Sequence, residues 1–177
     1  MDGIKDMAKG SQAENNYKIF IFDWGDTLMR VFPGEKGPMC QWPEVEAVGD
    51  APEVLKKLSK CADCYLATNA KDSAKADIRR ALKRVGMDAR IKDIFCYRDM
   101  GCEKSSKAYF KEMMRRLQAE KHEIILIGDS PEKDVRWAIE NGIAGILLDP
   151  ENRHPNCQYP KIRSLLEIVP GEAKQMT

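Results

Sequence analysis

Five residues of the sequence are of types that could carry out chemistry, and their spacing suggests that they act together. Asp23, Thr68 and Asp129 each end a short apolar run, Lys104 follows another such run, and Asp134 lies about one helical turn beyond Asp129. Several carboxylates suit a hard divalent cation, Mg²⁺ above all. A lysine and a threonine supply donors to phosphoryl oxygens, and a carboxylate can attack phosphorus to give an aspartyl-phosphate. These residue types therefore indicate phosphoryl chemistry.

The elements that must position these residues alternate along the chain. The apolar runs are typical of strands buried on both faces, and they cover residues 17–23, 64–68, 94–97, 124–129 and 143–149. Helical patterns cover residues 52–60, 73–85, 105–120, 131–141 and 162–169. This alternation predicts an α/β fold, a three-layer sandwich with a central parallel sheet of the Rossmann-like kind. Ligands of such sheets bind beyond the carboxyl ends of the strands, where the five residues fall.

The length of 177 residues favours one domain. Residues 1–16 lack periodicity, and we expect a flexible N-terminal tail there, followed by a single domain over residues 17–177. Residues 29–49 are rich in proline and glycine and predict a long irregular loop, a flap over the site. The segments between the candidate residues are too short for a separate cap domain.

The amino-acid composition limits which binding partners and which cellular compartment we expect. Lys and Arg total 29 against 28 Asp and Glu, so the charge balance gives no reason to expect a nucleic acid or a membrane as partner. No stretch approaches the about 20 apolar residues of a membrane span, and no secretory signal is expected. Six irregularly spaced cysteines favour a cytoplasmic protein over a disulfide framework. Packing is the preferred explanation for Cys61 and Cys64, and any other role for the pair stays open.

Four short motifs follow one another in a fixed order. They are Ile19 to Leu28 (IFIFDWGDTL), Leu66 to Asn69 (LATN), Gly101 to Lys104 (GCEK) and Ile127 to Ser130 (IGDS). Each alone is weak evidence, but the ordered set resembles the haloacid dehalogenase-like (HAD) superfamily, mostly Mg²⁺-dependent phosphatases that pass through an aspartyl-phosphate. The resemblance covers residues 17–149 and implies the strand order 5-4-1-2-3.

The resemblance also implies a metal site. By its pattern, Asp23 is both the nucleophile and a ligand of Mg²⁺, the backbone carbonyl of Gly25 is a second ligand, and Asp129 is a third. Asp134 would stand just behind the metal and orient its ligands.

The remaining motif residues are implied to hold the transferring phosphoryl group. Thr68 would donate a hydrogen bond to it, with help from the amide of Asn69. Lys104 would pair with the charge of Asp23 and with the phosphoryl oxygens.

The first motif departs from the family at the position that matters for proton transfer. Phosphatases of the family usually carry a second Asp two residues after the nucleophile, which acts as general acid and then as general base, whereas this chain has Gly25 followed by Asp26. Loss of that group removes a factor of roughly 10²–10⁴ in rate. Asp26 is the candidate to replace it, but its offset by one residue in a tight turn points the side chain elsewhere. Members that break C–halogen or C–P bonds also lack this Asp, but they normally carry a large cap.

The leading prediction is a Mg²⁺-dependent phosphatase, slow because of Gly25, with a phosphorylated small molecule or macromolecule as substrate. The alternative is a catalytically silent phosphoryl-binding or interaction protein on the same fold. A receiver domain of two-component signalling is disfavoured, because its acidic pair would lie on the first strand. Capless members of the family often close the site with a neighbouring subunit, so the sequence leaves the oligomeric state undecided. The mouth of the site is expected to expose Trp24, which would contact substrate, together with Trp42 and either Arg153 or His154.

Overall fold

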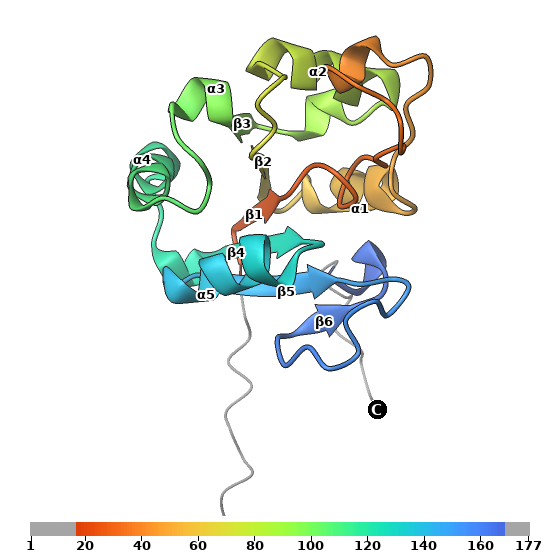
Figure 1. Cartoon of the computed structure of the whole chain (residues 1–177). Helices are drawn as coiled ribbons and strands as arrows, with labels where there is room; N and C mark the ends of the chain where they lie inside the picture. The colour runs from red at the N-terminus through yellow and green to blue at the C-terminus, as the bar shows by residue number, and fades with distance from the viewer. Residues whose placement is uncertain (1–16, 169–177) are drawn as a thin grey trace, which may run out of the picture.

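A six-stranded parallel sheet forms the centre of the protein, which a computed structural model describes over residues 17–168 (Figure 1). The strands lie in the order β3-β2-β1-β4-β5-β6, so the predicted order 5-4-1-2-3 is confirmed and β6 extends it beyond β5. Their bounds are Ile19–Phe22 for β1, Asp63–Thr68 for β2, Asp93–Cys96 for β3, Ile124–Gly128 for β4, Ala144–Leu148 for β5 and Lys161–Ile162 for β6. The predicted tail, residues 1–16, lies outside the described residues.

The helices follow the predicted alternation with shifted ends. Their bounds are Ala51–Leu58 for α1, Lys75–Arg84 for α2, Tyr97–Met100 for α3, Lys107–Leu117 for α4 and Trp137–Glu140 for α5, which continues a π-helical turn at Pro131–Arg136. Short 3₁₀ turns lie at Met39–Gln41, Asp88–Arg90, Lys121–Glu123 and Leu165–Ile168.

Two predicted elements differ from the structure. The helix expected over residues 162–169 is wrong at its start, because Ile162 pairs with Leu148 as part of β6 and only a 3₁₀ turn follows; Val169 lies outside the described residues. Tyr97, expected as the last residue of the third strand, instead begins α3. Both differences arise in short segments, where pairing with a neighbouring strand outweighs local periodicity.

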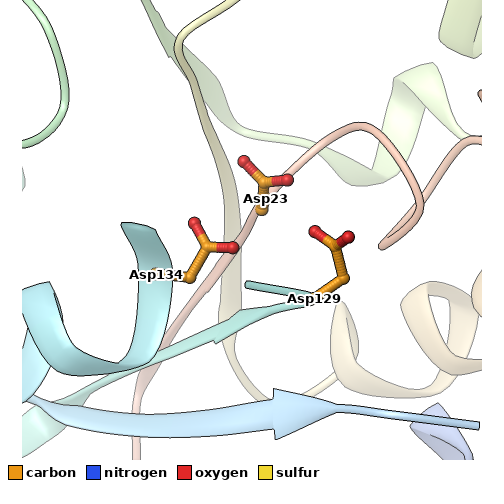
Figure 2. Close-up of side chains that lie close together, drawn as sticks. All are labelled: Asp23, Asp129 and Asp134. Atoms are coloured by element: carbon orange, nitrogen blue, oxygen red, sulfur yellow. The ribbon is translucent and has the colours of Figure 1, made fainter. Parts of the chain in front are cut away.

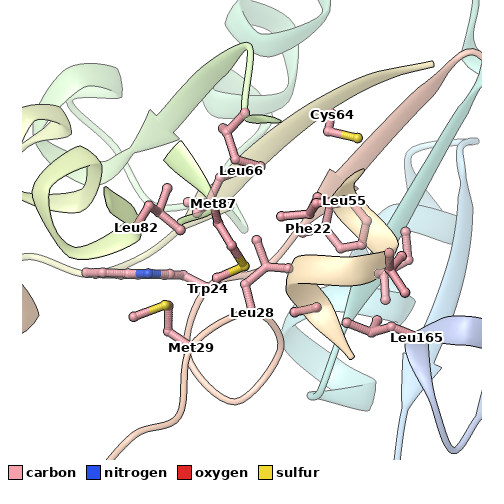
Figure 3. Packing of buried hydrophobic residues seen from close by; sticks show 14 of the residues in the cluster. Phe22, Trp24, Leu28, Met29, Leu55, Cys64, Leu66, Leu82, Met87 and Leu165 are labelled. Atoms are coloured by element: carbon pink, nitrogen blue, oxygen red, sulfur yellow. The ribbon is translucent and has the colours of Figure 1, made fainter. Parts of the chain in front are cut away.

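Alternate residues of β1 face opposite sides of the sheet, and each side has its own core. Phe20 and Phe22 belong to a cluster that includes residues of α1 and α2 (Figure 3). Ile19 and Ile21 belong to the other cluster, with residues of α4 and α5. The period-2 alternation of a strand therefore places one helical layer on each face, as predicted.

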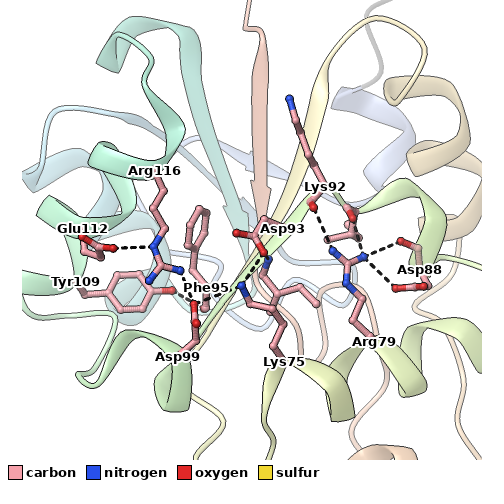
Figure 4. A network of polar contacts seen from close by, with 12 residues as sticks. Lys75, Arg79, Asp88, Lys92, Asp93, Phe95, Asp99, Tyr109, Glu112 and Arg116 are labelled. Carbon is pink, nitrogen blue, oxygen red and sulfur yellow. Dashed lines mark hydrogen bonds and ion pairs between the residues drawn. The ribbon is translucent and has the colours of Figure 1, made fainter.

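Charged side chains cover the sheet edge formed by β3 (Figure 4). Lys75 of α2 pairs with Asp93 at 2.8 Å, and Arg116 of α4 pairs with Asp99. Arg79 donates hydrogen bonds to the backbone carbonyl of Ile91 at 2.7 Å and to further acceptors nearby. Lys75 and Arg79 thus fasten α2 to the edge strand and the segment before it, and Arg116 ties α4 to α3; an uncovered row of backbone groups at this edge would invite unwanted pairing.

The 29–49 segment lies against α2. Trp42 is buried in the core, and its Nε1 donates to the carbonyl of Gly37 at 3.1 Å. Arg84 of α2 donates to the carbonyls of Trp42 at 2.6 Å and Pro43 at 2.8 Å. These bonds hold the middle of the segment to a helix. Over residues 17–168, none of the helices combines the length and the apolar character that crossing a bilayer requires.

Candidate active site

Three carboxylates meet at the carboxyl ends of β1 and β4. Asp23 follows β1, Asp129 follows β4, and Asp134 lies on the π-helical turn; Figure 2 shows all three pointing toward one another. One oxygen from each lies within 4.8 Å of those from the other two. The two strands are neighbours, and the amide of Asp23 donates to the carbonyl of Ile127 at 2.8 Å. Strand pairing therefore brings together two acidic residues that are far apart in the chain.

Lys104 provides a buried positive charge to this cluster. Its side chain is 2% exposed, and its Nζ donates to Asp23 Oδ1 at 2.7 Å and also to Asp134 Oδ1. Burial alone would lower the pKa of Lys104, but the charges of Asp23 and Asp134 outweigh burial and hold the pKa above its ordinary value. The ammonium group therefore stays protonated and links the two carboxylates.

Three carboxylates surround one buried cation, and the pKa values of two of them are raised. Burial, opposed by Lys104 and aided by the charges of Asp134 and Asp129, raises the pKa of Asp23 to about 7. The pKa of Asp129 is also raised, by burial and then by Asp134. Three carboxylates beside one ammonium leave an excess negative charge that a divalent cation would neutralise.

The donor set fits Mg²⁺. Its atoms are hard carboxylate oxygens, and the second oxygen of Asp23 and both oxygens of Asp129 receive no hydrogen bond from a side chain within residues 17–168. Both oxygens of Asp134 are engaged, Oδ1 by Lys104 and Oδ2 by the backbone amide of Ser130 at 3.1 Å. Asp23 and Asp129 are thus the side chains free to bind the ion, and Asp134 holds the surroundings in place.

Gly128 makes room for Asp134 behind the site. A Cβ atom at residue 128 would lie 2.3 Å from Asp134 Cγ, which is closer than real Cβ contacts. Ser130 then begins the π-helical turn, and its Oγ accepts a hydrogen bond from the amide of Lys133 at 3.2 Å. The Gly-Asp-Ser sequence therefore ends the strand, allows the close approach of Asp134 and starts the next turn.

Thr68 and Asn69 lie across the site from Asp129, at the end of β2. Thr68 Oγ1 accepts a hydrogen bond from the amide of Ala70 at 3.1 Å, which leaves its own hydroxyl hydrogen to donate. Asn69 Oδ1 accepts from the amide of Lys104 at 2.6 Å. The side chain of Asn69 thus anchors the loop that delivers Lys104.

These residues line one open cavity of about 450 Å³, which we call the carboxylate pocket. The residues of its walls that the sequence had singled out are Asp23, Thr68, Asn69, Lys104, Asp129, Asp134 and His154, and Ala70, Ser130, Pro131 and Lys133 complete it. Lys133 was not anticipated. The available signal was its place in the first turn after Ser130, which turns it toward the same edge of the sheet.

The two tryptophans expected at the mouth lie elsewhere. Trp24 is 4% exposed and packs in the core with Leu28 and Met87, so it does not line the carboxylate pocket (Figure 3). Trp42 is buried under α2. Both are large apolar groups next to an available core, and burial of an aromatic side chain outweighs exposure at a polar rim.

Asp26 also lies outside the carboxylate pocket. Its backbone has φ 55°, a left-handed conformation, and its Oδ1 accepts a hydrogen bond from the amide of Val31 at 3.0 Å. Its side chain therefore closes its own turn. At Gly25, a Cβ atom would lie 2.9 Å from Val31 Cγ2, so the side chain of Val31 occupies the space into which a residue at position 25 would project.

A second cavity of about 620 Å³ adjoins the first, and we call it the side cavity. Asp129 and His154 line both cavities. The predicted flap, residues 29–49, contributes Val31 and other residues to the side cavity, which Asp129 also lines, and none to the carboxylate pocket. Arg153 also lines the side cavity. The carboxylate pocket therefore opens sideways into a polar space.

The site thus combines a parallel sheet with three carboxylates and a buried lysine at its carboxyl edge. The profile of the haloacid dehalogenase-like hydrolase family matches residues 41–142, more than half of the chain. The protein belongs to this family. The match begins after the first motif, and it is the structure that places Asp23 among the matched residues Lys104, Asp129 and Asp134.

Solved structures share the fold. An uncharacterized protein from Listeria monocytogenes serotype 4b has 24% identity and a TM-score of 0.74, over 86% of this chain and 94% of that one. The putative HAD-hydrolase YfnB from Bacillus subtilis, bound to magnesium, has 18% identity and a TM-score of 0.70, over 86% and 96% of the two chains. A HAD phosphatase from Thermococcus onnurineus has 22% identity and a TM-score of 0.59, over 70% and 56%. No curated protein sequence matches significantly.

Proposed function

We propose that the protein is a Mg²⁺-dependent phosphatase that hydrolyses phosphate monoesters through an aspartyl-phosphate on Asp23. The observation that carries this proposal is the meeting of Asp23 with Asp129, Asp134 and the buried Lys104 at one open pocket. Carboxylates that outnumber the local cation attract Mg²⁺, and an ammonium beside a carboxylate nucleophile suits an anionic substrate. Family membership supports the hydrolase class.

In this proposal each residue has a defined task. Asp23 attacks phosphorus with one carboxylate oxygen and would bind Mg²⁺ with the other. Thr68 donates its hydroxyl hydrogen to a phosphoryl oxygen, and Lys104 keeps Asp23 ionised and oriented. Mg²⁺, held by Asp23 and Asp129, would neutralise phosphoryl charge as it builds up. Asp134 keeps Lys104 in place.

The substrate in this proposal is a phosphoester with a sizeable leaving group. The carboxylate pocket is open, and its shared wall with the side cavity leaves room beyond the phosphoryl group. A small molecule and a phosphorylated macromolecule both satisfy this requirement. The expectations of a cytoplasmic location and of no nucleic acid or membrane partner remain part of the proposal.

The proposal is tested with p-nitrophenyl phosphate in the presence of Mg²⁺ and of EDTA. We expect phosphate release that EDTA abolishes and that falls at least 10²-fold in Asp23→Asn. Asp63→Asn is the matched control, because Asp63 begins β2 at the opposite end of the strand and pairs only with the exposed Lys92 in the described structure. A silent phosphoryl-binding protein, the alternative function, would bind a phosphate mimic with Mg²⁺ but release no phosphate.

A further inference from the structure

His154 stands where the two cavities meet. It belongs to the loop between β5 and β6, at the same edge of the sheet as Asp23, and it lines both the carboxylate pocket and the side cavity. A phosphoester whose phosphoryl group lies against Asp23 and whose leaving group extends into the side cavity would pass this imidazole. His154 therefore lies where the leaving group would pass from one cavity to the other.

The backbone of this loop is fixed by a buried carboxylate. Asp149, 3% exposed, accepts hydrogen bonds from the amide of Arg153 at 2.7 Å and from the amide of His154 at 3.0 Å. Lys161 donates to the carbonyl of His154 at 3.1 Å. All these contacts involve main-chain atoms of His154. They therefore hold the residue at the pocket without using its imidazole.

The groups that hold Asp23 in place are not suited to carry a proton to and from the substrate. Lys104 is locked between two carboxylates, and Asp134 has both oxygens engaged. Asp26 lines the side cavity but not the carboxylate pocket, and its Oδ1 accepts a hydrogen bond from the amide of Val31. Imidazole is the side chain that most often transfers protons near neutral pH.

We propose that His154 is the general acid and general base of this enzyme, in place of the acidic residue absent at Gly25. The inference rests on the proposed phosphatase function and adds a catalytic residue to it. It also explains how a site whose position 25 is filled by the side chain of Val31 retains proton transfer.

The two half-reactions balance through His154. In the first, Asp23 forms a bond to phosphorus, the ester P–O bond breaks, and the leaving oxygen takes a proton from the imidazolium. In the second, the neutral imidazole takes a proton from water, whose oxygen attacks phosphorus. The bond between phosphorus and the Asp23 oxygen then breaks, inorganic phosphate leaves, and the imidazolium is restored.

The test compares two substrates in His154→Gln. Phenyl phosphate has a leaving group that needs a proton, whereas p-nitrophenolate leaves readily without one. We expect kcat/KM to fall about 10²-fold or more for phenyl phosphate and less than tenfold for p-nitrophenyl phosphate. Phosphoenzyme trapped by acid quench from p-nitrophenyl phosphate should accumulate in the variant, because its hydrolysis has lost the base.

Two controls separate this effect from others. His122→Gln removes an exposed imidazole that lines neither cavity, and it should leave both substrates unchanged. Lys133→Gln removes a cation from the pocket wall and should affect both substrates by the same factor. An unfolding midpoint of His154→Gln close to that of the wild type would show that the loop is intact.

The outcomes distinguish the two proposals. Equal losses on both substrates without phosphoenzyme accumulation, in a wild type that is active, would overturn the role of His154 alone. A wild type that neither forms phosphoenzyme nor releases phosphate would overturn the phosphatase proposal, and the role of His154 would fall with it.

Discussion

Replacement of Lys104 by methionine tests the electrostatic basis of the site. Lys104 and Lys75 each bridge two aspartates, but the side chain of Lys104 is 2% exposed and that of Lys75 is 35% exposed. Methionine keeps most of the lysine volume and removes the charge. Lys104→Met leaves Asp23 and Asp134 facing each other without their cation, whereas the aspartates around Lys75 remain partly hydrated.

The two variants should lose different amounts of the free energy of unfolding. Removal of one partner from a buried ion pair costs about 3–5 kcal/mol, because the remaining charge is left uncompensated. An exposed pair is worth about 0–1 kcal/mol. Urea unfolding at pH 7 without metal should therefore show a loss of about 4 kcal/mol for Lys104→Met and at most about 1 kcal/mol for Lys75→Met.

The sign of the pH dependence follows from the carboxylates. Burial already raises the pKa of Asp23 to about 7 in the folded protein, and loss of the lowering effect of Lys104 raises it further. An aspartate in the unfolded chain has its ordinary pKa, near 4. Between about pH 7 and pH 4 the folded variant therefore binds a proton at Asp23 that the unfolded chain does not bind, and the stability of the variant increases as the pH falls through this window. Lys104→Met should recover part of its loss at pH 5, and added Mg²⁺ should do the same at pH 7. Equal losses for the two lysine variants, or a Lys104→Met variant that is no more stable at pH 5 than at pH 7, would refute the reasoning.

Three further predictions follow from single contacts. Gly128→Ala should displace Asp134, against which the new Cβ atom would clash at 2.3 Å, and lower the affinity for Mg²⁺ about 10–100-fold in calorimetric titration; unchanged affinity would contradict it. Arg84→Ala should cost about 1–2 kcal/mol in thermal unfolding by releasing the 29–49 segment, yet leave phosphate release intact. In a His154→Gln background, Gly25→Asp combined with Val31→Ala should raise phosphate release from phenyl phosphate by about 10²-fold over Val31→Ala alone, and no gain would show that the space taken by Val31 is not the missing acid position.

Much of the site could be predicted because its residues are placed by local rules. Nearly continuous apolar runs, typical of strands buried on both faces, locate β1, β2 and β4, and in parallel strands the residue after each run must lie at the same edge of the sheet. The chain order of the motifs and the resemblance to a known family then bring Asp23 and Asp129 together. The structure confirms the predicted strand order, while the chemical roles of these residues remain proposals.

Directions of individual side chains in the first motif were beyond the reach of the sequence. Trp24 and Asp26 flank Gly25 in one tight turn, yet one is buried in the core and the other bonds to Val31. Which way each points depends on the packing partners that later segments supply. The buried aromatic ring gains from α2 and its neighbours, which no local pattern around residue 24 contains.

The sequence by itself determined the alternation of strands and helices, the residues that end each strand and the order of the chemical motifs. Only the tertiary structure decided that residues 29–49 lie against α2, that β6 joins the sheet and that His154 faces the carboxylate pocket. The physical reason is range: periodicity and turn chemistry act over a few residues, whereas Arg84 on the carbonyl of Trp42 acts across 42 positions of the chain. Contacts of that kind exist only once the sheet has assembled.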